Sequence, residues 1–372
     1  MKQFHKKSIF FEAISNLLFF KKKKRATNYA KILVFDFHLI GDMVLLTAFL
    51  EHLRIHFPCS KIHLVAPTWS DPILQNTNYV DTIHFFEAPW VKKQNHLSGI
   101  RNLLKLALRL RKVKFDLGIE MRGDLRQLML LWLCNPIEIT GFSFTGGNRI
   151  ITNPVPDSGN IYHLLLHHKK ILDVVSQTTT PVEEFVPKLS LSTSERFTVR
   201  HLRRTRQQSG RKIVGLHPFA SSGLRMLDEV AIYDLIKQIS TSFHVIIFFT
   251  KDVLHLKDQL IPPGLDVELF SGTLRQFIVQ VASLDLFVGM DSGGGHIAAG
   301  LGVNVVSIFG PANDFYCKPI GTGTVTIVKL LDSEVPCRPC DQIHCTNRSY
   351  KKCLRDLSTK QIMGAIHQGI MN

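Results

Sequence analysis

The stretch Leu286–Gly300, with the sequence LFVGMDSGGGHIAAG, decides the fold that we expect for this chain of 372 residues. It begins with five apolar residues, continues through a carboxylate and three consecutive glycines, and ends in small residues that suit a helix. A short apolar run followed by a glycine turn and a helix is typical of a parallel β-sheet that helices cover on both faces. The stretch therefore predicts an α/β fold.

The glycine turn of this stretch has the features of a diphosphate cradle. Consecutive glycines let the backbone approach a ligand closely, and a helix start offers unpaired amides with a partial positive charge. Asp291 is suited to sugar hydroxyls and His296 to a phosphate. The other interpretation is a flexible turn with an aspartate cap and a histidine in the core. The candidate binding residues of this turn are Asp291, Ser292, Gly293, Gly294, Gly295 and His296.

The same alternation of apolar runs and helical patterns extends over both halves of the chain. Two such blocks meet in the polar segment 177–211, whose beginning has the composition of a linker. The pattern predicts two Rossmann-like domains with parallel sheets that face a central cleft, and ligands that bind beyond the carboxyl ends of the strands. The predicted strands are 31–37, 61–67, 82–87, 115–121, 137–142, 212–218, 244–250, 267–270, 286–290 and 303–309, and the predicted helices lie near 42–57, 97–113, 124–133, 228–241, 273–284 and 294–301.

The turn His38–Met43 follows the first predicted strand and opens a helix. It contains neither G-x-G-x-x-G nor G-x4-G-K-[ST], so it is neither a dinucleotide fingerprint nor a P-loop. Gly41 allows a tight turn. Asp42 either caps the helix or acts as a general base that takes a proton from an attacking hydroxyl. The residue types alone leave both roles open.

A third turn, His217–Arg225, follows the first strand of the second block. Its hydroxyls at Ser221 and Ser222 suit phosphate oxygens, and Arg225 is suited to offset charge on a leaving diphosphate. The other interpretation is an ordinary polar loop with a solvated arginine.

The net charge of +15 indicates a polyanionic partner: nucleic acid, an anionic membrane or phosphorylated substrates. Residues 1–25 contain eight basic residues and one acid, nearly half of the surplus. Their apolar stretch 8–20 is too short to span a bilayer by ~5 residues. It lacks a small-residue cleavage site and five cations follow it, which argues against a secretory signal. We expect an interfacial helix on an anionic membrane surface, with a frayed basic tail as the other interpretation.

Other classes of protein are disfavoured. A chain that is 45% hydrophobic is not largely disordered. The sequence has no helix-turn-helix, no aromatic–basic strand motif and no zinc-finger spacing, so we expect no nucleic-acid partner. Four cations recur on one face of the helix predicted at 97–113, where they either meet phosphates of a lipid or membrane or form a solvated face. They are Arg101, Lys105, Arg109 and Lys112.

Four cysteines cluster near the end of the chain with the spacing C-x2-C-x4-C-x7-C. In the reducing cytoplasm that the missing signal peptide implies, four thiolates in a loop favour a structural zinc site. Unligated structural cysteines or a redox-labile disulfide remain the alternatives. The four are Cys337, Cys340, Cys345 and Cys353.

Four motifs together resemble glycosyltransferase family 9, the ADP-heptose:lipopolysaccharide heptosyltransferases, over roughly residues 30–370. Ile40-Gly41-Asp42 follows the first strand, and residues 115–126, FDLGIEMRGDLR, look like the family's DLxIDLRGxxRS segment. Residues 291–299 look like its D-[ST]-G-x-x-H-x-A-A signature, with Phe309-Gly310-Pro311 downstream. The cysteine-rich tail also recurs in many members.

The resemblance implies a GT-B fold and an inverting transfer that needs no metal. The charge pattern marks off a basic amphipathic segment at 1–26, and the resemblance implies an acceptor domain at 27–185 and a nucleotide-sugar domain at 186–372. Asp42 would be the general base, and Arg225 would stand where the family usually has a lysine against the diphosphate. Asp291, Gly293 and His296 would line the donor site, and the turn chemistry described above adds Ser221, Ser222, Ser292, Gly294 and Gly295 to it. Arg122 and Arg126 follow a predicted strand end, where they are suited to carboxylates or phosphates of the acceptor, and we assign Gly41 to the same acceptor site. His163 matches a family histidine loosely or is structural.

We therefore expect transfer of a sugar, heptose from ADP-heptose, onto a lipopolysaccharide core or related glycolipid, at the inner face of the cytoplasmic membrane. The chain departs from the family in two places. Met226-Leu227-Asp228 stands where the family often has Trp-Pro, and Thr250–Leu254 replaces its G-x-x-x-E segment. That glutamate usually helps to bind the donor, so the alternatives are another nucleotide sugar or a catalytically impaired binding protein of the same fold.

Overall fold

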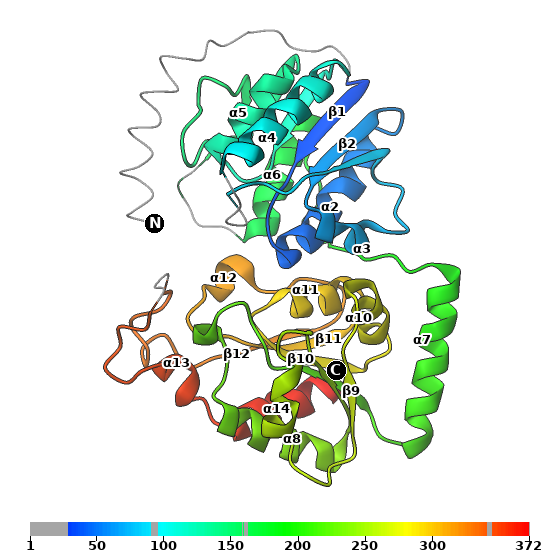
Figure 1. The fold of residues 1–372 in the computed structure, drawn as a ribbon, viewed down its shortest axis with the longest axis vertical. Helices are drawn as coiled ribbons and strands as arrows, with labels where there is room; N and C mark the ends of the chain where they lie inside the picture. Colours follow the sequence, from blue (N-terminus) through cyan, green and yellow to red (C-terminus); the bar gives the residue numbers. More distant parts are fainter. Residues whose placement is uncertain (1–28, 91–95, 158, 160–162, 341–343, 372) are drawn as a thin grey trace. The chain divides into compact units, whose positions relative to one another are not determined.

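The computed structural model describes residues 29–90, 96–157, 159, 163–340 and 344–371 (Figure 1). The chain divides into two compact units. The first takes in the residues up to Asp71 and Thr77–Phe185, and the second takes in Pro72–Asn76 and Val186 onward. The segment Pro72–Asn76 thus packs with the half of the chain that follows it by more than a hundred residues.

The first unit contains a six-stranded sheet in the order β3-β2-β1-β4-β5-β6, and every pair of neighbouring strands is parallel. Helices α2 and α6 pack together, as do α4 and α5, so the two pairs cover the sheet (Figure 1). The strands are β1 (Lys31–Phe35), β2 (Lys61–Ala66), β3 (Thr82–Phe85), β4 (Leu117–Glu120), β5 (Glu138–Gly141) and β6 (Asn153–Pro154), and the helices up to residue 185 are α2 (Ile40–His56), α3 (Asp71–Leu74), α4 (His96–Arg111), α5 (Leu125–Cys134) and α6 (Leu164–Ser176).

The second unit contains another six-stranded parallel sheet, in the order β12-β11-β10-β7-β8-β9. Helix α14 packs on α8, and α10 contacts both α7 and α11. The strands are β7 (Ile213–His217), β8 (His244–Phe248), β9 (Val267–Phe270), β10 (Leu286–Met290), β11 (Asn304–Ile308) and β12 (Val325–Val328), and the helices are α7 (Thr193–Arg206), α8 (Glu229–Ser242), α9 (Lys257–Leu260), α10 (Leu274–Val281), α11 (Gly293–Gly300), α12 (Asp314–Cys317), α13 (Lys352–Arg355) and α14 (Thr359–Met371).

The predicted α/β fold with parallel sheets is confirmed, and its physical basis is burial of both faces of each sheet. In β1 the residues Ile32–Phe35 are all buried, and so are all five residues of β10. Leu33 and Phe35 belong to one core cluster with α4 and α5. Successive side chains of a strand point to opposite faces of the sheet. Because both faces are buried here, apolar residues occupy consecutive positions instead of alternating with polar ones.

Both sheets reverse their strand order between the first and fourth strands of their unit. These pairs are β1 with β4 and β7 with β10. In an open parallel sheet, the carboxyl ends of the strands at this switch point border the crevice that binds ligands. The turns after β1, β4, β7 and β10 are therefore the positions to examine for a site.

The structure adds elements that the sequence did not predict. Helix α7 occupies much of the segment expected to begin as a linker, and Ser192 and Glu195 form a capping box at its start. Helices α6 and α14 and strands β6 and β12 were also not predicted. Among the described helices, none combines the length and the apolarity needed to cross a bilayer.

Candidate active site

In the first unit, the turn after β1 places Asp42 in the first turn of α2. One oxygen of its carboxylate accepts the backbone N–H of Leu39 at 3.1 Å. The other lies 3.3 Å from Nη1 of Arg122, in the turn after β4, and both side chains are 18% exposed. Asp42 is thus a helix cap and an ion-pair partner at once, and it remains accessible to a substrate.

The same turn holds a second acid–base pair, to which the sequence analysis gave no role. Asp36 follows β1 and is fully buried, and its Oδ1 lies 2.7 Å from Nδ1 of His38, whose side chain is 24% exposed. Burial by itself would raise the pKa of Asp36, but His38 and Arg122 hold the pKa below its usual value. The ionised carboxylate keeps the proton on Nδ1, so Nε2 of a neutral His38 is an acceptor. The pattern D-x-H at residues 36–38, one residue before Ile40-Gly41-Asp42, is the signal that would have found it.

The turn after β4 is held by a buried glutamate. Glu120 accepts the backbone N–H groups of Arg122, at 3.1 Å, and of Gly123. Burial raises the pKa of Glu120 to about 8. Gly123 has φ +70°, and a Cβ there would lie 2.9 Å from the backbone nitrogen of Phe144, so only glycine fits. The turn is thereby fixed in a geometry that places Arg122, after β4, beside Asp42, after the neighbouring strand β1.

Arg126, the second predicted acceptor arginine, has local partners. It pairs with Asp124 at 2.5 Å, and its guanidinium lies 5.2 Å from the centre of the Trp90 ring. Of the two arginines, Arg122 is the one that contacts Asp42. His163 caps helix α6, where its Nδ1 accepts the N–H of Leu165 at 3.1 Å, which favours the structural role for this histidine.

In the second unit, the turns after β7 and β10 meet through an ion pair. Nη1 of Arg225 lies 3.3 Å from Oδ2 of Asp291, and the two side chains are 40% and 8% exposed. Burial raises the pKa of Asp291, and Arg225 opposes that rise. Ser222 caps the short turn Gly223–Arg225 through Leu224 N–H at 3.3 Å, while Ser221 is exposed. The structure therefore joins Arg225 to the turn that begins helix α11.

The three glycines of α11 are explained in part by packing. A Cβ on Gly294 would lie 2.8 Å from Cζ of Phe287, and one on Gly295 would lie 3.1 Å from Cγ of Pro319. These two glycines let the helix sit close to the sheet. Gly293, at the first position of the helix, is partly exposed and is the glycine placed to meet a ligand, whereas His296 is buried.

Several buried polar atoms near these turns have no hydrogen-bond partner within the described part of the chain. They include Oδ2 of Asp291, whose contact with Arg225 lacks hydrogen-bond geometry, and the hydroxyl of Ser292, the residue before α11. Buried polar atoms in native proteins are almost always paired. A polar ligand bound at these turns would supply partners for these atoms. The others in these elements are Nδ1 of His217, whose pKa burial lowers to about 4, and Oγ of Ser307 in β11.

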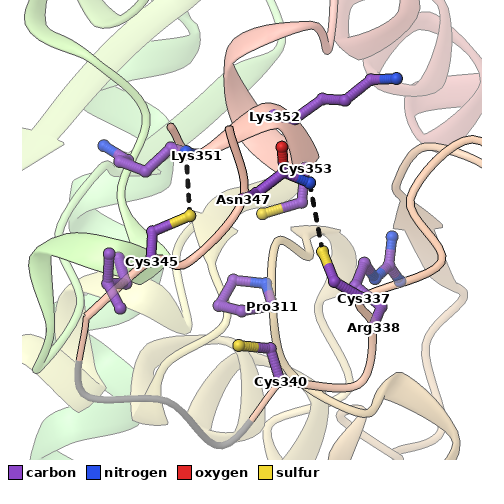
Figure 2. A pocket seen from close by; sticks show the side chains of 10 residues that line it. Pro311, Cys337, Arg338, Cys340, Cys345, Asn347, Lys351, Lys352 and Cys353 are labelled. Atoms are coloured by element: carbon purple, nitrogen blue, oxygen red, sulfur yellow. Dashed lines mark hydrogen bonds between the residues drawn. The ribbon is translucent and has the colours of Figure 1, made fainter. Parts of the chain in front are cut away.

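The cysteine cluster does not form the predicted zinc site. Across residues 29–371, leaving aside the gaps in the description, no group of three or more His, Cys, Asp or Glu side chains is placed to hold a metal ion. Figure 2 shows the four cysteines around one small pocket, which Pro311 also lines. Two sulfurs accept hydrogen bonds instead: Cys337 from the Asn347 side chain at 3.5 Å and Cys345 from Lys351 N–H at 3.3 Å. All four are free thiols, so no disulfide takes their place.

The tail that carries these cysteines packs on the turn after β11, the strand next to β10. Cys340 N–H donates to the carbonyl of Pro311 at 2.8 Å. A Cβ on Gly310 would lie 2.7 Å from Cγ of Leu354, so α13 packs directly on this glycine. The tail thereby fixes the turn after β11, next to the candidate ligand site.

A family profile described as glycosyltransferase family 9 (heptosyltransferase) matches residues 103–351, well over half of the chain. The chain belongs to glycosyltransferase family 9. Lipopolysaccharide heptosyltransferase 2 of Salmonella typhimurium is 21% identical over 353 residues, covering 91% of this chain and 97% of that protein. Lipopolysaccharide heptosyltransferase 3 of Escherichia coli K12 is 24% identical over 295 residues, covering 75% and 82%.

Solved structures show the fold of this family 9 enzyme. The E. coli ADP-heptose lipopolysaccharide heptosyltransferase II superposes with a TM-score of 0.72 at 18% identity, covering 92% of this chain and 98% of that one. The E. coli heptosyltransferase WaaC solved with ADP gives a TM-score of 0.66 at 12% identity, covering 91% and 99%. These structural matches confirm the predicted GT-B architecture, and membership of family 9 confirms the predicted glycosyltransferase activity.

Proposed function

We propose that this family 9 enzyme transfers heptose from ADP-heptose onto a hydroxyl of a lipopolysaccharide core or a related surface glycolipid. The unit built on β1–β6 takes the acceptor, and the unit built on β7–β12 takes the donor. The observation that carries the proposal is the pair of switch points: one presents an accessible carboxylate, the other a helix start with an arginine and unsatisfied buried polar atoms. Relatives named for heptosyl transfer over nearly the whole chain support the choice of sugar.

The reaction follows from these groups. Asp42 accepts the proton of the acceptor hydroxyl while its oxygen attacks the anomeric carbon of the donor, and the bond from that carbon to the diphosphate oxygen breaks. The departing ADP carries additional negative charge, which Arg225 and the amides at the start of α11 stabilise. Attack opposite the leaving group inverts the anomeric configuration.

Two further groups define the acceptor side of this proposal. Arg122 holds Asp42 and meets an anionic group of the acceptor, such as a phosphate or carboxylate. Nε2 of His38, fixed by the buried Asp36, accepts a hydrogen bond from an acceptor hydroxyl. Because the acceptor is a lipid, we also place the enzyme peripherally on the inner face of the cytoplasmic membrane, with residues 1–25, outside the described residues, as one contact.

Donor identity is tested by thermal stabilisation with ADP, UDP and GDP and their sugars. A ligand at 100 times its Kd stabilises the folded state by about 2.7 kcal/mol. ADP and ADP-heptose should raise the melting temperature most, and mass spectrometry should then detect one added heptose on a purified core glycolipid. Preferential stabilisation by UDP or GDP sugars would favour another nucleotide sugar as the donor. The reason to test this alternative is the exposed loop Thr250–Leu254, which replaces the family's G-x-x-x-E segment. Donor binding without turnover would favour the impaired enzyme.

A further inference from the structure

Helix α4 exposes an apolar stripe that nothing in the proposed reaction uses. Ile100, Leu104 and Leu108 are 52%, 46% and 60% exposed and are spaced by four residues, which places them on one side of the helix. The adjoining side of the helix packs into the core, because Leu106, Ala107 and Leu110 are buried there. The stripe is therefore an apolar surface of the helix that does not contribute to the core. Helices on the surface of a globular protein usually carry polar residues on their exposed face.

The charge beside the stripe is all of one sign. Residues 96–114 contain six basic residues and no acid. Helical spacing puts Arg101, Lys105 and Lys112 next to the stripe, on its far side from the core. A solvated helix face normally mixes acids with bases, whereas an apolar stripe bordered only by cations is typical of helices that lie in a membrane interface. The six cations, all exposed, are Arg101, Lys105, Arg109, Arg111, Lys112 and Lys114.

The neighbouring helix also exposes large apolar side chains. Helices α4 and α5 pack side by side (Figure 1), and α5 exposes Met129 and Trp132, which are 39% and 38% exposed. Tryptophan is enriched where a protein meets the headgroup region of a bilayer, because its ring is apolar and its N–H is polar.

We propose that the exposed face of α4, with Met129 and Trp132 of α5, docks the enzyme on an anionic phospholipid surface. Ile100, Leu104 and Leu108 enter the headgroup boundary, and the flanking cations contact lipid phosphates. This surface lies in the unit to which the proposed function gives the lipid acceptor, and the proposal rests on that function only in this respect. A protein partner or a second copy of the chain would need acidic side chains placed opposite these cations. An anionic bilayer presents negatively charged phosphates over its whole surface, so we favour the bilayer.

The test is co-sedimentation of the full chain with vesicles of phosphatidylglycerol and phosphatidylcholine. The paired change Leu104→Glu and Leu108→Glu should lower binding to phosphatidylglycerol vesicles at least about tenfold. The paired change Lys105→Glu and Lys112→Glu should lower it by a similar factor and reduce its salt dependence. All variants should keep the melting temperature of the wild type, which shows that they fold.

Two matched controls separate this surface from general hydrophobicity and charge. Val230→Glu removes an even more exposed apolar side chain (75% exposed) from α8, and Arg200→Glu with Arg204→Glu makes the same change in net charge on α7. Neither should change vesicle binding beyond the small effect of net charge. Equal losses in controls and α4 variants, or unchanged binding of the α4 variants, would overturn the proposal. So would a loss of self-association instead of vesicle binding. Vesicle binding is measured without donor or acceptor, so its outcome is independent of the proposed transfer.

Discussion

Two sheets with the same strand order carry different chemistry where that order reverses. Beside β1 and β4, the groups are side chains that pair by charge: Asp42 with Arg122, and Asp36 with His38. Beside β7 and β10, the groups are a helix start, hydroxyls and the ion pair of Arg225 with Asp291. A prepaired acid suits the removal of a proton, whereas a helix start with an arginine beside it suits the binding of an anionic leaving group. One topology thus serves two tasks through the residues in four turns.

The largest expected effect is that of Asp42→Asn, which tests whether the first switch point supplies the general base. Asparagine keeps an oxygen for Leu39 N–H, so α2 stays capped, but it accepts no proton from the acceptor. We expect kcat to fall about 10²–10⁴-fold, the usual contribution of a general base, with the ADP thermal shift unchanged. Asp258→Asn, in the first turn of α9, is the matched control. Near-normal turnover by Asp42→Asn would remove the base assignment.

The next largest effect is expected for Arg225→Ala, which tests whether the second switch point binds the diphosphate of the donor. Loss of the charge that meets the diphosphate should lower kcat/KM about 10²–10³-fold and shrink the thermal shift with ADP. Arg225→Lys should recover part of both, while Arg200→Ala, on the exposed face of α7, should change neither. A full ADP shift in Arg225→Ala would mean that the donor is held elsewhere.

A smaller effect sharpens the acceptor side. His38→Ala should raise the acceptor KM about tenfold, the order of one lost hydrogen bond in a binding site, and leave the donor KM unchanged. His38→Gln retains an acceptor atom and should recover most of the loss. If kcat alone falls in both variants, His38 acts on the proton and not on acceptor binding.

The smallest effect concerns pH and Glu120. Its pKa is raised from 4.5 to about 8 in the folded protein, so folding favours its protonated form. The stability that this group contributes is complete below about pH 4.5 and is lost as the pH rises toward 8. The melting temperature of the wild type should therefore fall more steeply from pH 5 to 8 than that of Glu120→Gln. Parallel pH profiles would show that Glu120 titrates normally.

The sequence by itself determined the alternation of strands and helices and the four turns that carry the candidate site. Apolar runs bounded by glycine and charge are local signals, and they located β1, β4, β7 and β10 to within a few residues. The motifs around Asp42 and Asp291 likewise identified the family before any contact was known. Local signals failed for α7, whose polar composition resembles a linker until its capping box is recognised.

Only the tertiary structure decided which of the candidates meet. Asp42 and Arg122 are 80 residues apart in the chain and become neighbours because β1 pairs with β4. The same reasoning applies to Arg225 and Asp291, which the pairing of β7 with β10 brings together. Spacing predicted a metal site from the four cysteines, but in the folded tail the sulfurs of Cys337 and Cys345 accept hydrogen bonds from N–H donors. Sequence fixes residue types along one dimension, whereas ion pairs, burial and ligand geometry depend on distances that only strand pairing sets.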